Sequence, residues 1–395
     1  MKIKKSSLLF VAFAVVIFWP DYFFFKGLNY LENILAAYAV IFIYNNRKRL
    51  SIFSYITLLY FVYFLLDTMF HGGGDIHTLI SNIKIMLFVQ VADIEIEKNA
   101  YDTISIMWMF VFAFAVINFI SLIAFPNGLY QIETVWNEWG AKTSSHYWVF
   151  GFKNSHAFWC LLLELLSALK WYLRPSNTNK ILAYICACVA VITQLLVGSS
   201  TATVACTIGA IAIFCVVFLK PKQDRNVLIN SYWIVVLNYL IDTMLVFGMV
   251  TFLGPIIQSV FGKDLTFSNR TNAWMAAFMG FLKNPVFGTG ILSSNAAKQY
   301  LGSLSYMHAH NEWLQCLWQG GIVLFVIVVG MFFSIAKQNT GIKERNLRVM
   351  SDLFLVSVFV EMAFEVWLGL QLTWIMLLLM YKINSIGRTN ICTIE

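Results

Sequence analysis

Charge is scarce in this chain. Asp, Glu, Lys and Arg make up only 12% of its 395 residues, while 59% are hydrophobic and the mean hydropathy is +0.73. Soluble domains average about a quarter charged residues. The composition therefore excludes an ordinary soluble protein and predicts a polytopic membrane protein.

Cysteine patterns, internal repeats and low-complexity linkers are also lacking. Most of the seven cysteines lie in apolar runs, where a thiol is an ordinary packing group. We therefore expect one membrane domain over residues 1–395, with no cofactor and no metal. The net charge of +7 does not indicate a nucleic-acid partner, because in a membrane protein the distribution of Lys and Arg matters more than their sum.

Long apolar runs dominate the chain. A helix needs roughly 20 apolar residues to cross a bilayer, and unbroken runs of this length favour an all-α fold. The first run, 7–25, is expected to be a retained span, since no small-residue cleavage site follows it. The predicted spans are 7–25, 28–44, 50–70, 76–93, 102–124, 155–173, 181–197, 201–219, 227–252, 313–335, 349–367 and 368–383.

The side of each loop follows from its basic residues. With about 12 crossings, most Lys and Arg residues fall in loops on the side of the termini, as the positive-inside rule requires. The fourth span is the weakest, because it carries His77, Asn82 and Lys84; without it, every later loop would change sides. The count favours cytoplasmic termini and two long extracytoplasmic loops, 125–154 and 253–312.

The loop 125–154 is rich in aromatic and amide side chains. It is either an interfacial aromatic belt or a platform for sugars, since aromatic faces stack on pyranose rings and amides bind hydroxyl groups. Both interpretations remain open.

Six carboxylates fall within or at the edge of predicted spans, where charge is costly. Glu361 and Glu365 are spaced i, i+4, so both are expected on one helical face, lining a polar cavity or sharing protons. Alternatively, most of the six sit near span ends and reach water. The six are Glu32, Asp67, Glu164, Asp242, Glu361 and Glu365.

The larger loop carries most of the polar chemistry. After Ser268-Asn269, which can cap a helix, Trp274, Phe278 and Phe281 repeat as in an amphipathic helix. Arg270 falls in its first turn, where backbone N–H groups and the helix dipole favour an anion. The later Gly288-x-Gly290 is weak evidence for phosphate binding and more typical of a plain turn.

His308, His310 and Asn311 lie where this loop enters the tenth span. A histidine there can act as a general base near neutral pH, with Asn311 orienting it. The alternative is that both histidines are interfacial polar residues. A metal site is weakly supported, because His-x-His lacks a third ligand.

Taken in order, these motifs resemble a known family. Ser-x-Arg, a tryptophan-bearing amphipathic helix, Asn-Pro-x-x-Gly-x-Gly, then His-Asn-x-x-Leu-Gln-x-Leu and Gly-Gly are similar to the O-antigen ligase and polysaccharide polymerase superfamily. The resemblance implies a metal-independent inverting glycosyltransferase acting on glycans linked to a polyprenyl pyrophosphate. It implies that Arg270 holds the pyrophosphate and that His310 deprotonates the acceptor hydroxyl. The expected substrate-binding residues are Lys153, Asn311, His308 and Trp274.

The chain also departs from the family. Ser200 stands where many members have an arginine after the seventh span. Lys153, in a segment resembling the family's Gly-Phe-x-Asn-Pro-Asn, either supplies the missing charge or is a lysine snorkelling at the interface.

Three functions follow as hypotheses. The first is a polymerase joining carrier-linked repeat units into capsule, exopolysaccharide or O-antigen at the outer face of the cytoplasmic membrane. The second is a ligase moving finished polymer to lipid A core or another acceptor. The third, from another class, is a transporter or flippase for lipid-linked glycan. The expected partners are the glycan donor, the glycan acceptor, the lipid bilayer and other membrane proteins of polysaccharide assembly.

Overall fold

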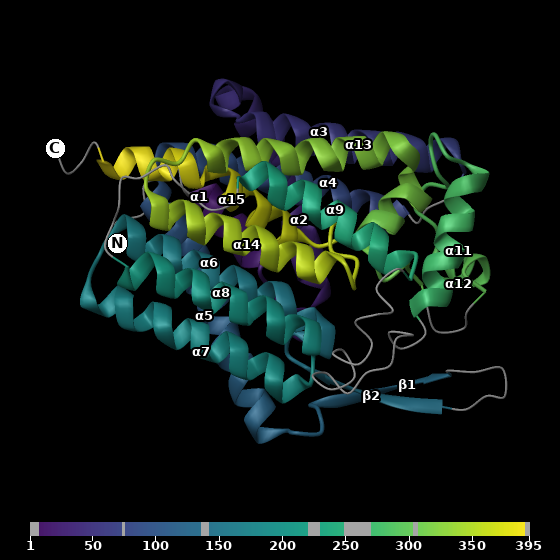
Figure 1. Ribbon diagram of the computed structural model, residues 1–395, viewed down its shortest axis with the longest axis horizontal. Helices are drawn as coiled ribbons and strands as arrows, with labels where there is room; N and C mark the ends of the chain where they lie inside the picture. The colour runs from purple at the N-terminus through teal and green to yellow at the C-terminus, as the bar shows by residue number, and fades with distance from the viewer. Residues whose placement is uncertain are drawn as a thin grey trace.

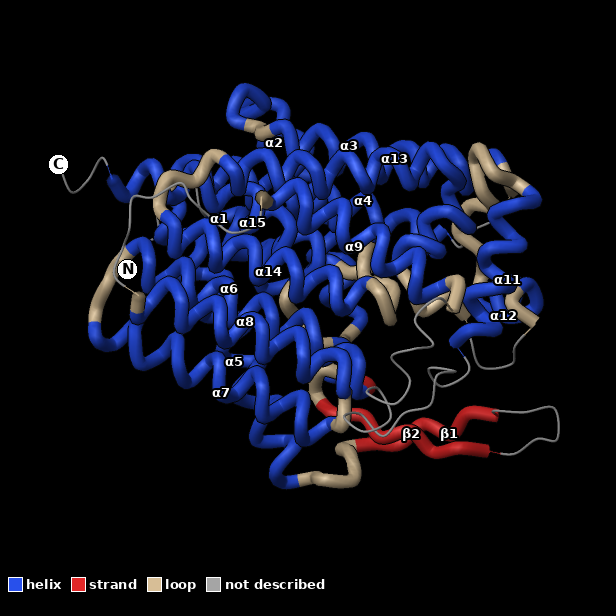
Figure 2. The backbone as a smooth tube through the Cα atoms, in the orientation of Figure 1, coloured by secondary structure: helices blue, strands red, loops and turns tan. Residues whose placement is uncertain are grey.

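The computed structural model describes residues 8–72, 76–135, 142–219, 230–248, 270–302 and 307–391. Long helices running roughly along one axis make up nearly all of this part of the chain (Figures 1 and 2). The helices are α1 (Leu8–Ile17), α2 (Lys26–Asn46), α3 (Ile52–Phe70), α4 (Ile76–Lys98), α5 (Ala100–Ala124), α6 (His156–Leu173), α7 (Asn177–Val197), α8 (Ser200–Phe218), α9 (Ser231–Val246), α11 (Arg270–Lys283), α12 (Ser294–Tyr300), α13 (Glu312–Thr340), α14 (Arg345–Met362) and α15 (Gln371–Ile391).

Each predicted span overlaps one of these helices, although the spans 7–25 and 349–367 extend past the ends of α1 and α14. Among the described residues, six helices are long and apolar enough to cross a bilayer, and α1 and α9 are shorter apolar helices. The fold is thus that of a multi-pass membrane protein and is nearly all-α. The number of crossings, about twelve, stays a prediction.

The interior is built around α6. Its residues from His156 to Leu169 are all buried, as expected for a helix that is apolar all round. Helix α8 approaches it closely, since a Cβ on Gly209 would lie 2.1 Å from the Glu164 carboxylate. Only glycine permits this approach of α8 to α6.

The expectation of an all-α fold was wrong for the loop 125–154. Strands β1 (Tyr130–Val135), β2 (Lys142–Trp148) and β3 (Gly151–Phe152) form an antiparallel sheet in the order β1-β2-β3. Tyr130 pairs with Tyr147, and their rings stack 5.2 Å apart. Cross-strand aromatic pairs of this kind stabilise a hairpin, and strands this short leave little hydropathy signal.

Helix α13 is interrupted at Gly321, whose φ is 62°. Across this break, Thr289 and Gly290 donate backbone hydrogen bonds to Trp318 and Gln319, while Ile322 donates to Pro285. A Cβ on Gly288 would lie 2.5 Å from the backbone of Gln319. The Gly-x-Gly segment therefore serves a tight backbone packing, in keeping with the plain turn rather than a phosphate loop.

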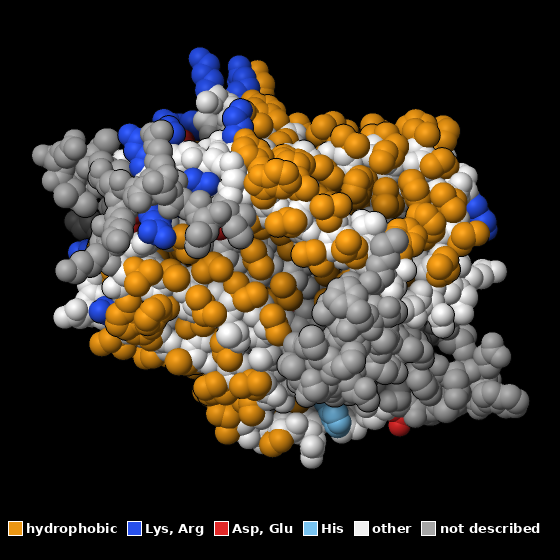
Figure 3. Space-filling view, in the orientation of Figure 1, with side chains coloured by type: hydrophobic (Ala, Val, Ile, Leu, Met, Phe, Trp, Pro, Cys, Tyr) orange, Lys and Arg blue, Asp and Glu red, His pale blue; other side chains and the backbone are white. Residues whose placement is uncertain are grey.

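The surface is apolar along the bundle and charged at one end. Hydrophobic side chains cover much of the face in Figure 3, and Lys and Arg gather at its left end. Helix α15 ends there, whereas α11, α12 and the hairpin lie toward the opposite end (Figure 1). The two long predicted loops thus share the end away from most of the basic residues.

Candidate functional site

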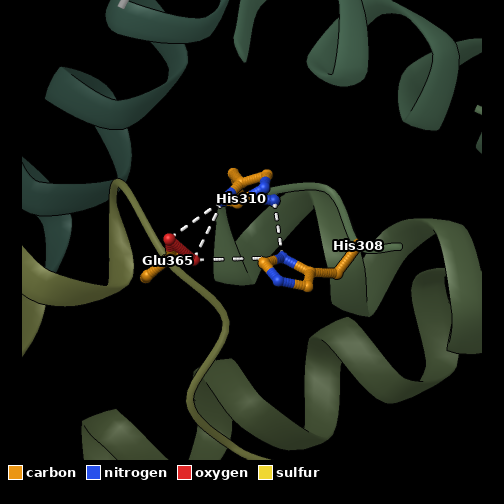
Figure 4. Close-up of side chains that lie close together, drawn as sticks. All are labelled: His308, His310 and Glu365. Atoms are coloured by element: carbon orange, nitrogen blue, oxygen red, sulfur yellow. Dashed lines mark hydrogen bonds and ion pairs between the residues drawn. The ribbon is translucent and has the colours of Figure 1, made fainter. Parts of the chain in front are cut away.

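The candidate site is a cluster around the carboxylate of Glu365. Three distant segments meet there: Asn154 from the helical turn η4 (Lys153–Ser155), Arg270 at the start of α11, and His308 and His310 just before α13. Figure 4 shows both histidine rings beside Glu365.

Glu361 and Glu365 keep part of the predicted i, i+4 relationship, because the backbone N–H of Glu365 donates to the carbonyl of Glu361 at 3.0 Å. Helix α14 ends at Met362, and α15 begins only at Gln371. The predicted span 349–367 runs past this end because the turn that follows α14 is itself apolar and looks like the continuation of a span. Freed from the helix, Glu365 points to the histidines, whereas Glu361 stays buried within α14.

Two side chains of the α13 entrance fix this turn. One oxygen of Glu312 accepts hydrogen bonds from the backbone N–H groups of Trp367 and Leu368. Asn311 caps α13 by accepting from Leu314, and its amide donates to Asp242 and to the backbone oxygen of Ala363. Asn311 is fully buried, and its hydrogen bonds join the start of α13 to α9 and to the turn after α14.

His310 is held in an unusual backbone conformation. Its φ of 52° makes it the only non-glycine residue with positive φ in the described chain. Such a conformation persists when the surroundings enforce it, and here Trp274 donates from Nε1 to the carbonyl of His310 at 3.4 Å. Trp274 is itself buried, so this hydrogen bond helps to hold the backbone of His310 in place.

The imidazole of His310 faces Glu365 through Nδ1, which lies 2.9 Å from both carboxylate oxygens. A proton on Nδ1 makes this a hydrogen bond to the carboxylate and leaves Nε2 as the basic nitrogen. This is the geometry of a general base oriented by an acid.

His308 differs from His310 in where its proton lies. Its Nδ1 accepts the backbone N–H of His310 at 3.3 Å, so that nitrogen carries no proton toward Glu365, 3.9 Å away. Burial lowers the pKa of His308 to about 4; the neighbouring His310 and Arg270 act in the same direction, and the Glu365 carboxylate opposes them. His308 is therefore neutral at pH 7 and supports His310 rather than forming an ion pair.

Glu365 is ionised. Burial by itself raises its pKa, but the hydrogen bond from His310 and the neighbouring histidine and Arg270 side chains lower it to about 2. Arg270 donates from Nη2 to Oε1 at 3.1 Å, and the Asn154 amide donates to the same oxygen at 2.8 Å. The carboxylate thus joins a cation, an amide and the candidate base.

The other predicted residues lie apart from this cluster. The Lys153 ammonium lies over the Phe152 ring at 5.7 Å, and it is the neighbouring Asn154 that reaches Glu365. Ser200 begins α8, and within the described chain no hydrogen bond or ion pair joins it to Glu365. The predicted caps Ser268 and Asn269 lie outside the described residues. Asn154 and Glu365 were not predicted for the site, although each lies in a stretch that the sequence singled out.

A metal ion is the alternative use of the cluster. His308, His310 and Glu365 each offer one ligand atom, and these atoms lie within 4.8 Å of one another, so the fold supplies the third ligand that the sequence lacked. However, Arg270 and Asn154 already donate to Glu365, and a guanidinium beside a metal ion is electrostatically unfavourable. The donors fit a hydrogen-bonded base better than a metal centre.

Comparison with known proteins agrees with the motifs. Residues 182–329 match the family model for O-antigen ligase. The matched segment contains Arg270, Trp274, His308 and His310 but ends before Glu365. No curated protein matches the chain significantly. With its apolar helices, the chain is a multi-pass membrane protein that over this segment is similar to the O-antigen ligase family.

Proposed function

We propose that the protein is a polysaccharide polymerase that joins repeat units carried on a polyprenyl pyrophosphate. The observation that carries this proposal is the pairing of His310 and Arg270 on one carboxylate, Glu365. A base and an anion-binding cation held side by side are what transfer of a glycan from a pyrophosphate requires.

The reaction follows from the geometry. Nε2 of His310 takes the proton of an acceptor sugar hydroxyl, and the resulting imidazolium is stabilised by Glu365. The acceptor oxygen attacks the anomeric carbon of the donor as the bond from that carbon to the pyrophosphate oxygen breaks. Attack from the opposite face inverts the anomeric centre, and the proton on His310 returns to solvent.

Arg270 stabilises the departing pyrophosphate. One of its N–H groups is engaged by Glu365, but a guanidinium has five donors and binds phosphate oxygens in pairs. Its place at the start of α11 adds the free N–H groups and positive dipole end of the helix. No metal ion is needed for this charge stabilisation.

The location proposed for this chemistry is the outer face of the cytoplasmic membrane. Helix α11, which begins at Arg270, lies toward the end (Figure 1) opposite the one where Lys and Arg gather (Figure 3), and the positive-inside rule assigns the basic end to the cytoplasm. Both termini are then cytoplasmic.

A ligase shares this chemistry and differs in its acceptor. Deleting the gene separates the two functions. Single-repeat product without long chains indicates a polymerase, whereas long polymer accumulating on the carrier indicates a ligase. A transporter would instead depend on carboxylates within the spans. Glu365 is not one of these, because it contacts Arg270 and His310 of the loop.

A further inference from the structure

A second feature of interest is a cavity of about 150 Å³ beside the catalytic cluster. It lies between the first turns of α13, helices α3 and α4, and the turn 363–370. Both segments that carry site residues continue into its wall: Glu312 follows His310 by two residues, and Val366 follows Glu365 directly. The cavity therefore adjoins the proposed site of transfer.

One wall is polar because of helical spacing. Glu312, Gln315 and Gln319 are spaced i, i+3, i+7 on α13, which places them on one face. Asn82 of α4 also lines the cavity. Gln319 is only 8% exposed, yet within the described chain its side-chain amide has no hydrogen-bond partner.

Because Gln319 and Asn82 line the cavity and have no protein partner for their amides among the described residues, a polar occupant that bonds to them is favoured over an apolar one. Gln315 uses its oxygen to accept from the backbone of Ala309 at 2.8 Å, which leaves its NH₂ group as a donor. Asn82 likewise forms no hydrogen bond within the described chain. The cavity thus presents several amide donors and acceptors at once.

The facing wall is aromatic. Tyr60, Phe61 and Phe64 of α3 line it, and the first and last lie against each other with their centroids 5.8 Å apart. An aromatic wall opposite a row of amides suits a pyranose, which has apolar faces and an equator of hydroxyl groups. The volume is that of about five water molecules, a size that admits one six-membered ring.

We propose that this cavity binds one sugar residue of the carrier-linked glycan while another residue reacts at His310. This inference rests on the proposed function and deepens it by assigning a glycan subsite. The isoprenoid chain of the carrier is a poorer occupant, because it would leave the amides of Gln319 and Asn82 without partners.

The test measures binding, so that it does not depend on turnover. Protein carrying His310→Ala is placed in lipid nanodiscs and titrated with two probes. One is the carrier-linked repeat unit extracted from a strain lacking the gene, and the other is glycan-free polyprenyl pyrophosphate. Gln319→Leu and, separately, Asn82→Leu are added to this background. Gln299→Leu is the matched control, since Gln299 is exposed on α12 and lies outside the cavity.

We expect Gln319→Leu and Asn82→Leu each to weaken binding of the glycan-bearing probe by roughly fivefold to tenfold, the loss of about one hydrogen bond. Binding of the glycan-free probe and both affinities of Gln299→Leu stay unchanged. Equal weakening for both probes would assign the cavity to the carrier and overturn the proposal. So would unchanged binding in both cavity variants.

Failure of the proposed function gives a different result. In that case the protein binds neither probe before any cavity substitution is made. The two lining variants are on different helices, so a folding defect in one, seen as a lowered Tm, leaves the other to decide.

Discussion

Nδ1 of His310 lies 2.9 Å from both carboxylate oxygens of Glu365. This symmetric contact fixes the ring, selects the tautomer with its proton on Nδ1 and places a negative charge beside the imidazolium that forms when Nε2 accepts a proton. Glu365 is thus a positioning residue for the proposed base, and its charge is the property to test.

Glu365→Gln keeps the shape of the side chain and removes its charge. We expect polymer formation to fall by about 10² to 10⁴-fold, because the amide neither stabilises the imidazolium nor enforces the tautomer. The measurement is the initial rate of repeat-unit joining by purified protein over a range of pH.

A matched control is Glu97→Gln. Glu97 lies on α4, where it pairs with Lys382 away from the site. The initial rate of repeat-unit joining by the Glu97→Gln variant should equal that of the wild type. A Glu365→Gln variant with the wild-type rate and pH profile would show that the carboxylate has no part in the chemistry.

Protonation of His308 at acid pH is expected to destabilise the folded protein. Its pKa is lowered to about 4 in the folded protein from 6.5, so the unfolded chain binds its proton first. Stability is fully present above about pH 6.5 and declines as the pH falls toward 4. We expect the Tm of His308→Gln in detergent to fall less over this window than that of the wild type. Parallel Tm curves would contradict the assignment of a neutral His308.

The break in α13 requires glycine at position 321. Gly321→Ala places a Cβ 2.2 Å from the Val286 carbonyl oxygen at a φ of 62°, and we expect it to destabilise the protein by about 1–3 kcal/mol. Gly330→Ala, on the same helix with nothing within 4 Å, should leave Tm unchanged or raise it. Similar Tm values for the two variants would show that residues 285–290 do not pack on the break.

Much of the fold could be predicted from hydropathy, because a lipid environment imposes long apolar helices. The prediction failed where the hydropathy pattern gives no sign that a helix ends. Ala363, Phe364 and Trp367 are as apolar as the helices on either side, so the turn that presents Glu365 read as a span. The hairpin 130–148 was likewise too short to show in a search for spans.

Part of the site could also be predicted from the hydropathy pattern. Arg270 and His310 were found because they stand in a polar loop, but their common partner is 55 residues beyond His310. Asn154 comes from the opposite direction along the chain. Pairing across such distances is set by the packing of α11, α13 and α14, which no local pattern records.

Chelation tests the alternative use of the cluster. Because Arg270 and Asn154 occupy the Glu365 carboxylate, we expect polymer formation to continue at the wild-type rate after EDTA treatment and removal of free metal by dialysis. Loss of activity that a divalent cation restores, and that His308→Gln abolishes, would identify the cluster as a metal centre.

The most direct test of the central claim is the glycan profile of a deletion strain complemented with wild type, Arg270→Ala or His310→Ala. The account predicts long polymer with the wild type, and carrier-linked single repeats without polymer for each variant, while membrane fractions contain equal amounts of the three proteins. Normal polymer from either variant would contradict the assignment of His310 as base and Arg270 as the pyrophosphate-binding cation.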